Sequence, residues 1–256
     1  MVLVIDDIDH LQAGLRFVAT VGVFDGVHLG HVHVLERLRA LAEELRAVPV
    51  AITFEPHPQA VITGRAPDLI CDPQDKVARM ADAGAGVVVV QRFDEAFRSQ
   101  TAEAFLERLA RGRELVGLVM SHESAFGRDR QGTVDTVQRL AARDGWRLVE
   151  VDTLEVDGAP VSSSRIRACL GAGDLAAAER MLGRAYRVPG NLGQDGVFQP
   201  VDSFVAVAPG DYRVLIDGRR SAATIDDGGR IRLGGSTGPD LPAQVLLEFL
   251  GDPAVA

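Results

Sequence analysis

Two histidines in a glycine-containing stretch are the residues whose types and spacing most clearly suggest chemistry. His28 and His31 close the string Gly22-Val-Phe-Asp-Gly-Val-His-Leu-Gly-His31. An apolar run at residues 17–23 predicts a buried strand before it, and residues 33–46, apolar at three- and four-residue steps, predict an amphipathic helix after it. Such a turn suits phosphate binding, because glycines let the backbone approach the anion and a helix start offers unpaired N–H groups. We expect both histidines to face a phosphate chain; the plainer alternative is a packed turn with incidental histidines.

A second string combines hydroxyls with cations. In Ser162-Ser-Ser-Arg-Ile-Arg167, three serines precede two arginines. A serine at a helix start is usually a cap, and capping alone would explain one of the three. Three hydroxyls with two guanidinium groups make a denser anion site than a cap requires. They suit the β- and γ-phosphates of a nucleoside triphosphate.

A third stretch is the loop Glu55-Pro-His-Pro58, which follows apolar residues 50–54. Its two prolines predict a stiff, non-helical loop at the carboxyl end of a strand. In open α/β sheets, ligands bind at that edge. Phe54 and His57 would then form one wall of an aromatic ligand site, although a plain turn fits these residues equally well.

The elements that must position these strings alternate along the chain. Apolar runs alternate with amphipathic segments, which predicts an α/β fold with a doubly wound, Rossmann-like parallel sheet. Besides the strand already described, the predicted strands cover residues 50–54, 87–91, 115–120 and 146–151.

The pattern changes near Tyr186. Downstream, short segments are separated by turn signals such as Asp217-Gly218, which predicts a small β domain. We therefore expect one domain over residues 1–186 and a second over residues 187–256.

The composition is that of an ordinary globular protein, with 46% hydrophobic and 25% charged residues among 256. A net charge of −9 argues against a nucleic-acid or anionic-membrane surface. No apolar run reaches the length of a membrane span, and residues 1–9 mix apolar residues with aspartates, so we expect a cytoplasmic protein. The oligomeric state does not follow from the sequence.

The residue types also limit the binding chemistry. Lys76 is the single lysine, so almost all cations available to an anion are arginines, whose fork suits bidentate phosphate contact. Cys71 and Cys169 lack metal-ligand spacing and are expected to be reduced thiols.

Together, these strings resemble those of a known enzyme family. His28-Leu-Gly-His31 with the string 162–167 is similar to the signature of the nucleotidylyltransferase superfamily. The string 22–31 with Thr53-Phe-Glu-Pro-His-Pro58 resembles the N-terminal adenylyltransferase module of prokaryotic FAD synthetases, the bifunctional riboflavin kinase/FMN adenylyltransferases. The resemblance covers roughly residues 15–190.

The resemblance implies a reaction between ATP and FMN, or a related flavin phosphate. The FMN phosphate would attack the α-phosphorus of ATP, giving FAD and pyrophosphate without a covalent enzyme intermediate. Catalysis would rest on aligning two anions and on stabilising the charge that develops. Mg²⁺ would bridge the phosphates and be held largely by substrate and water, so no protein ligand cluster for a metal is implied.

Motif matching to this family also assigns site residues. Those implied to contact the triphosphate and the transition state are His28 and His31. Those implied to hold the leaving pyrophosphate are Ser163, Ser164 and Arg167. Those implied to border the adenosine and the α-phosphate are Gly22, Phe24, Asp25 and Gly26. Those implied to border the flavin are Phe54, Pro56, His57, Pro58 and Phe126.

The chain departs from the family pattern in two places. Where the family has a short polar residue and then an aromatic one, this chain has Glu123 and Ser124, and the Glu123 carboxylate would add repulsion near the phosphate acceptor. This leaves open another phosphorylated acceptor or another nucleotide, such as CTP. After Tyr186 no Pro-Thr-Ala-Asn kinase motif follows, so we interpret the tail as a truncated remnant without riboflavin kinase activity. A non-catalytic protein that binds flavin nucleotides is a further alternative.

Overall fold

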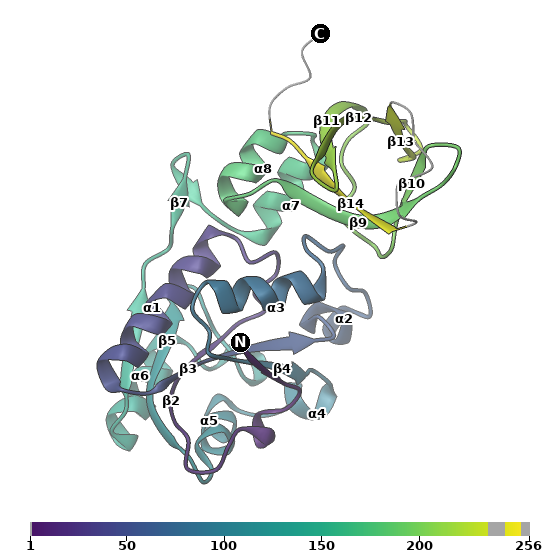
Figure 1. Ribbon diagram of the computed structural model, residues 1–256. Coiled ribbons are helices and arrows are strands. Elements are labelled where there is room, and N and C mark those ends of the chain that lie inside the picture. The colour runs from purple at the N-terminus through teal and green to yellow at the C-terminus, as the bar shows by residue number, and fades with distance from the viewer. Residues whose placement is uncertain (1, 235–243, 252–256) are drawn as a thin grey trace. The chain divides into compact units, whose positions relative to one another are not determined.

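A six-stranded parallel sheet organises the first part of the chain in this computed structural model, which describes residues 2–234 and 244–251 (Figure 1). Its strands are β1 (Leu3–Ile5), β2 (Arg16–Val21), β3 (Val48–Glu55), β4 (Val87–Arg92), β5 (Glu114–Ser121) and β6 (Arg147–Val151). They pair in parallel in the order β1-β4-β3-β2-β5-β6. The winding direction therefore reverses between β2 and β5, where an open α/β sheet binds its ligands. The predicted doubly wound sheet is confirmed.

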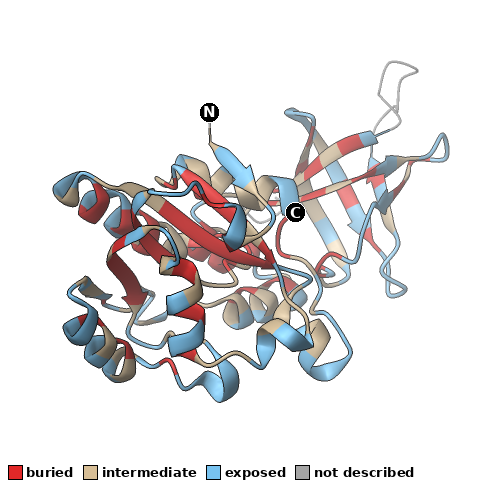
Figure 2. Ribbon diagram, turned by 90° about the horizontal axis from the view of Figure 1, so that it is seen from below, coloured by how far each residue is buried: buried red, intermediate tan, exposed pale blue. Residues whose placement is uncertain are grey.

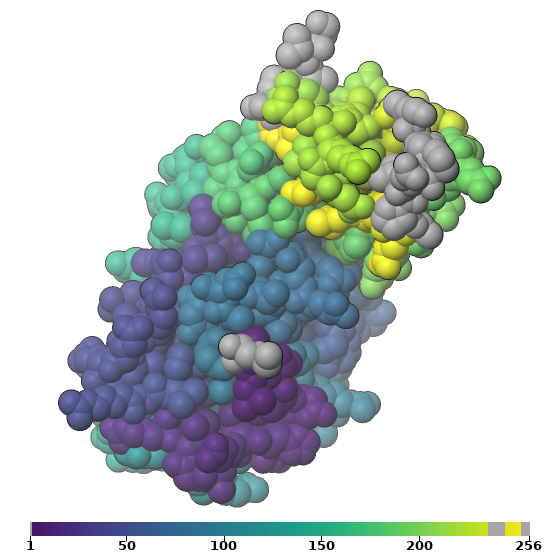
Figure 3. Space-filling model, in the orientation of Figure 1, coloured from purple at the N-terminus to yellow at the C-terminus, as the bar shows by residue number. Residues whose placement is uncertain are grey.

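Helices cover both faces of this sheet. They are α1 (Leu29–Leu45), α2 (Pro58–Thr63), α3 (Pro73–Asp82), α4 (Glu95–Arg98), α5 (Ala102–Ala110) and α6 (Val134–Asp144), with short 3₁₀ turns η1 (Ile8–His10) and η2 (Arg128–Arg130). Helices α1 and α3 lie over one face (Figures 1 and 3), and right-handed crossovers place α5 and α6 on the other. Buried residues follow the strands because both faces are covered (Figure 2). On the α5 side, Phe105 packs in one cluster with Phe17 and Ile52.

Three local features differ from the sequence-based expectation. Pro49 was expected to precede the strand but lies inside β3, where its missing N–H is tolerated because pairing with β4 begins only at Val50. The loop after β3 ends earlier than expected, since α2 begins at Pro58 with His57 as its N-cap. For residues 94–98 the sequence predicts a short turn, but residues 95–98 form α4 because the Asp94 side chain accepts a hydrogen bond from the Phe97 N–H.

The remainder of the chain forms two helices, a hairpin and a barrel. The helices are α7 (Ser163–Gly171) and α8 (Leu175–Leu182), and the hairpin strands are β7 (Glu155–Val156) and β8 (Ala159–Pro160). The barrel strands are β9 (Tyr186–Leu192), β10 (Val197–Pro200), β11 (Gly210–Ile216), β12 (Arg219–Ile225), β13 (Ile231–Gly234) and β14 (Gln244–Phe249). They close antiparallel in the order β10-β13-β12-β11-β14-β9. The expected small β domain is therefore a closed barrel.

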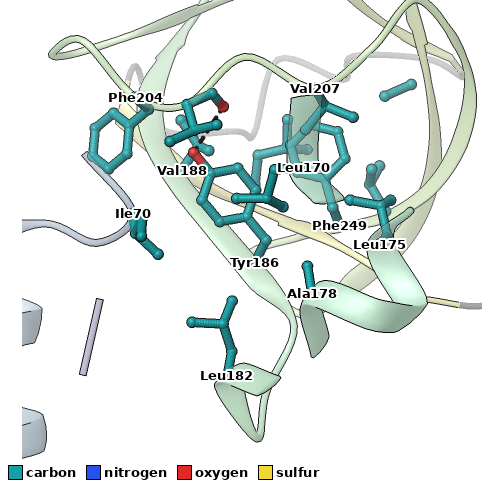
Figure 4. Packing of buried hydrophobic residues seen from close by; sticks show 14 of the residues in the cluster. Ile70, Leu170, Leu175, Ala178, Leu182, Tyr186, Val188, Phe204, Val207 and Phe249 are labelled. Atoms are coloured by element: carbon teal, nitrogen blue, oxygen red, sulfur yellow. Dashed lines mark hydrogen bonds between the residues drawn. The ribbon is translucent and has the colours of Figure 1, made fainter. Parts of the chain in front are cut away.

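A hydrophobic cluster joins the barrel to α7 and α8. Tyr186 stacks on Phe249 with ring centroids 6.0 Å apart, and Leu170 of α7 and Leu182 of α8 belong to the same cluster (Figure 4). The barrel and these helices therefore share one core.

The chain divides into two compact units. Unit 1 comprises Met1–Phe24, Gly30–Pro67 and Val77–Leu154, and unit 2 comprises Asp25–Leu29, Asp68–Lys76 and Glu155–Ala256. The glycine-containing string at residues 22–31 contributes to both. The domain boundary expected at residue 186 stays a prediction, and residues 235–243 and 252–256 of the expected second domain lie outside the described part.

Candidate active site

Residues 25–29, here called the phosphate loop, lie in unit 2 and end at Leu29, the first residue of α1. Gly26 has φ +76°, and a Cβ at this position would come within 2.7 Å of the Ile70 side chain, so only glycine fits. Val27 has φ +38°, which is strained for a β-branched residue. Arg184 compensates by donating to the Gly26 and Val27 carbonyls, the latter at 3.1 Å. The loop is therefore fixed before any substrate binds.

The start of α7 is attached to this loop. The Ser163 hydroxyl donates to the Asp25 carbonyl at 2.9 Å, and the Arg167 Nη2 lies 2.7 Å from the Asp25 carboxylate. Arg167 also donates from Nε and Nη2 to the Asp68 carbonyl at 3.0 and 2.7 Å. The N–H groups of Nη1 have no acceptor among the described residues. The N-terminus of α7 and part of an arginine fork thus lie against one loop within unit 2, as an anion site requires.

The serines and arginines of the 162–167 string have separate tasks. Ser162 is the N-cap of α7 and accepts from the Arg165 N–H at 3.2 Å, whereas the Ser164 side chain is exposed. Arg165 donates to the carbonyls of Val156 and Ala159, both at 2.9 Å, and so holds the β7–β8 hairpin. Its guanidinium was expected to add to the anion site but serves the hairpin instead.

His28 is the buried histidine of the phosphate loop, with 6% of its surface exposed. Burial, assisted by the nearby Arg184 cation, lowers the pKa of His28 from 6.5 to about 4. At neutral pH the ring is therefore uncharged, and it offers a phosphate no positive charge.

His31, Phe24 and Gly22 lie in unit 1. The Phe24 ring meets the His31 ring edge-on, with centroids 5.3 Å apart. A Cβ at Gly22 would lie 3.2 Å from the Phe24 ring, which makes this position tight for any side chain. Phe24, itself 2% exposed, thereby orients His31 at the start of α1.

An apolar cavity of about 340 Å³ lies within unit 1. Phe54, Phe93 and Phe97 lie within 6 Å of one another by ring centroids, and Phe97 continues through Phe105 to Phe126. The lining residues used below are Phe54, Pro58, Phe97, Gln100, Phe105 and Phe126. This size and aromatic lining suit a flat ring system.

Gln100 is the notable polar group of this cavity. Its Oε1 is buried and has no hydrogen-bond partner among the described residues. A buried acceptor without a donor is costly, so a ligand that supplies an N–H is favoured here.

The structure brings together only some of the residues expected around a flavin. Phe54, Pro58 and Phe126 line the cavity, while Pro56 and His57 are not among its lining residues. The His57 Nδ1 instead accepts from the Gln59 N–H at 3.1 Å and caps α2. Glu123, expected near the acceptor, has an exposed side chain and does not line the cavity.

Five contributors were missed in the sequence analysis. Phe93, Phe97, Phe105 and Gln100 follow β4, whose carboxyl end lies beside that of β3, so the edge argument applied to Phe54 could have been extended to them. The task of Arg184 gave no local signal, because the Gly26 and Val27 carbonyls that it binds lie more than 150 residues away in the chain.

The described residues contain no group of three or more His, Cys, Asp or Glu side chains arranged to hold a metal ion. No helix among them is long and apolar enough to cross a membrane.

Comparison with known proteins places these features in a family. The FAD synthetase family model matches residues 12–165. The bifunctional riboflavin kinase/FMN adenylyltransferases of Pseudomonas fluorescens and Haemophilus influenzae are each 35% identical over 68% of this chain and 57% of their own lengths. The bifunctional riboflavin kinase/FMN adenylyltransferase of Bacillus subtilis is 33% identical over 68% of this chain and 56% of its own length. The chain thus matches a little over half the length of these relatives.

A solved structure shares the fold. The crystal structure of a macrolide-efflux protein from Streptococcus pneumoniae superposes with a TM-score of 0.84, covering 97% of this chain and 90% of that one at 19% identity. The likeness supports the architecture of parallel sheet and barrel. On the family match across more than half of its residues, the chain belongs to the FAD synthetase family.

Proposed function

We propose that this protein is an FMN adenylyltransferase that makes FAD from ATP and FMN. An oxygen of the FMN phosphate forms a bond to the α-phosphorus of ATP, and the bond from that phosphorus to the bridging oxygen of the β-phosphate breaks. AMP is thereby transferred to FMN, and pyrophosphate leaves.

The observation that carries this proposal is the attachment of α7 to the phosphate loop. Ser163 and Arg167 both contact Asp25, four residues before α1 begins. The exposed Ser164 hydroxyl, the Arg167 Nη1 and the α7 N-terminus provide donors for the leaving pyrophosphate. Donors fixed in advance stabilise developing charge without reorganising during the reaction.

The histidines have different tasks in this mechanism. His28, uncharged at pH 7 because of its lowered pKa, borders the phosphates without acting as a cationic acid. His31, oriented by Phe24, contacts the phosphates at the reacting centre. The reaction needs no nucleophilic side chain, since the FMN phosphate is itself the nucleophile.

The aromatic cavity of unit 1 is proposed to receive the isoalloxazine ring. Its phenylalanines match the apolar faces of that ring, and the Gln100 Oε1 can accept from the N3–H of the flavin. The Glu123 side chain is exposed and does not line the cavity, so it gives no reason to infer that a ring other than isoalloxazine binds there.

Mg²⁺ is proposed to enter on the ATP phosphates. Mg²⁺ prefers oxygen ligands and keeps several waters, so phosphate oxygens and water would hold most of its coordination positions. Bound there, Mg²⁺ would neutralise part of the phosphate charge.

The barrel is proposed to lack riboflavin kinase activity. It closes with six strands, but the chain after Tyr186 contains no Pro-Thr-Ala-Asn string. This distinguishes the present chain from what is expected of a bifunctional enzyme.

Chromatographic detection of FAD tests the proposal. Purified protein with ATP, FMN and Mg²⁺ should convert FMN to FAD. The variant His31→Ala should lower turnover by roughly 100-fold with little change in the KM for FMN. The His31 side chain is proposed to contact the phosphates at the reacting centre and not the flavin ring. Equal losses in turnover and FMN affinity would contradict this role, and FMN left unconverted by the wild type would contradict the function.

A further inference from the structure

The barrel is attached, through a short segment, to the arginine proposed to bind pyrophosphate. Residues 68–70, here called the bridging segment, belong to unit 2 and lie between the barrel and the phosphate loop. We propose that the barrel acts as a positioning element for Arg167, so that Ser203 tunes adenylyl transfer although it touches no substrate. This inference rests on the proposed function.

The bridging segment is held firmly on the barrel side. The Leu69 N–H donates to the Ser203 carbonyl at 2.7 Å, and the Val205 N–H donates to the Leu69 carbonyl at 3.0 Å, as in a parallel bridge. The Ser203 hydroxyl donates to the Asp68 carboxylate at 2.8 Å. The buried Tyr186 hydroxyl donates to the Val205 carbonyl at 2.9 Å and fixes the other end of this bridge.

Hydrophobic packing supports the same attachment. Ile70 and Phe204 lie in one cluster with Tyr186 (Figure 4). Ile70 is 2% exposed and also lies where a Cβ on Gly26 would be, so the bridging segment reaches the phosphate loop directly.

On its other side the bridging segment holds the arginine. The Asp68 carbonyl accepts hydrogen bonds from both Nε and Nη2 of Arg167. The same Nη2 also forms an ion pair with the Asp25 carboxylate. These contacts fix one edge of the guanidinium plane and direct the Nη1 edge elsewhere. A displacement of Asp68 would therefore rotate the donors that remain for an anion.

This arrangement explains why a barrel without the kinase string can remain useful. Holding the fork in advance reduces the entropy lost when pyrophosphate is bound. Removing one support should weaken that orientation without unfolding the chain, because Ser203 is exposed.

A double-mutant cycle tests the proposal. Ser203→Ala should lower kcat/KM for ATP about three- to tenfold, the scale of one hydrogen bond, with the KM for FMN unchanged. Ser203→Thr keeps a hydroxyl and should restore most of the activity. In an Arg167→Lys background, which has already lost the fork, Ser203→Ala should change kcat/KM less than about twofold.

The matched control is Ser221→Ala, which removes a barrel hydrogen bond of 2.8 Å to the Gly234 carbonyl, away from the bridging segment. It should leave kcat/KM for ATP unaltered. An equal loss from Ser203→Ala in both backgrounds, or an equal loss from Ser221→Ala, would overturn the inference.

Binding measurements separate this inference from the proposed function. Calorimetric titration with magnesium pyrophosphate should show the same three- to tenfold weakening for Ser203→Ala. If the wild type makes no FAD, the proposed function fails while this titration still decides the inference. If FAD forms but Ser203→Ala alters neither rate nor pyrophosphate binding, the inference alone fails.

Discussion

His28 shows how the protein sets the charge of a single residue. The lowered pKa of about 4 means that the folded protein resists protonation of this ring, whereas the unfolded chain takes up a proton below about pH 6.5. Stability from His28 is therefore constant above pH 6.5 and is lost as the pH falls from 6.5 toward 4.

A variant makes this pH dependence measurable. Between pH 7 and pH 5, the wild type should lose about 2 kcal/mol more unfolding free energy than His28→Asn, because only the wild type buries a titrating ring. Urea unfolding at both pH values measures the difference, with the exposed His10→Asn as control. Parallel losses in wild type and His28→Asn would show that the ring is not held neutral.

Gln100 is the residue proposed to recognise the flavin ring by a hydrogen bond. Gln100→Leu should weaken FMN binding about tenfold, since it removes an acceptor for the N3–H. FMN methylated at N3 should bind the wild type about tenfold more weakly than FMN, but should bind Gln100→Leu about as well as FMN does. Fluorescence titration measures both.

The control for Gln100 is Gln138→Leu, at a glutamine that lines a different hollow of unit 1. We expect Gln138→Leu to bind FMN as tightly as the wild type does. If Gln100→Leu still discriminated against the methylated flavin, the proposed hydrogen bond would be wrong.

At the scale of elements, the string at residues 162–167 begins α7, and its serines are proposed to have different roles, one in stability and one in catalysis. Ser162→Ala should cost about 1 kcal/mol of stability through the lost cap, with nearly normal turnover. Ser164→Ala should keep stability and lower turnover, because its exposed hydroxyl is proposed to bind pyrophosphate. Thermal unfolding and FAD formation, measured on both variants, should show these opposite patterns; a large turnover loss in Ser162→Ala with stability intact would reverse the assignment.

The elements also show what the sequence could predict. Alternating apolar and amphipathic segments predicted the parallel sheet and α1. A buried strand and an amphipathic helix each leave a regular pattern of apolar residues in the local sequence. A cap among the three serines was predicted, and Ser162 provides it. The tasks of Arg165 and His57 could not be predicted, because their contacts depend on where the hairpin and α2 begin. The aromatic cavity was only partly predicted, because Phe97 meets Phe54, and Phe105 meets Phe97, through tertiary packing rather than sequence spacing.

The whole molecule combines a parallel sheet with a barrel, and the chain after Tyr186 contains no Pro-Thr-Ala-Asn string. Riboflavin with ATP should therefore yield no FMN, whereas FMN with ATP should yield FAD. A kinase assay by chromatography checks the first statement. FMN formed from riboflavin at a rate comparable to FAD formation would show that the barrel retains kinase activity by other residues.

The most direct test of the central claim is pyrophosphate release with Mg²⁺, with ATP, CTP and GTP each combined with riboflavin, FMN or no acceptor. The account predicts release only with ATP and FMN, together with an equal amount of FAD. Release with another nucleotide, or release from ATP that does not depend on FMN, would contradict it.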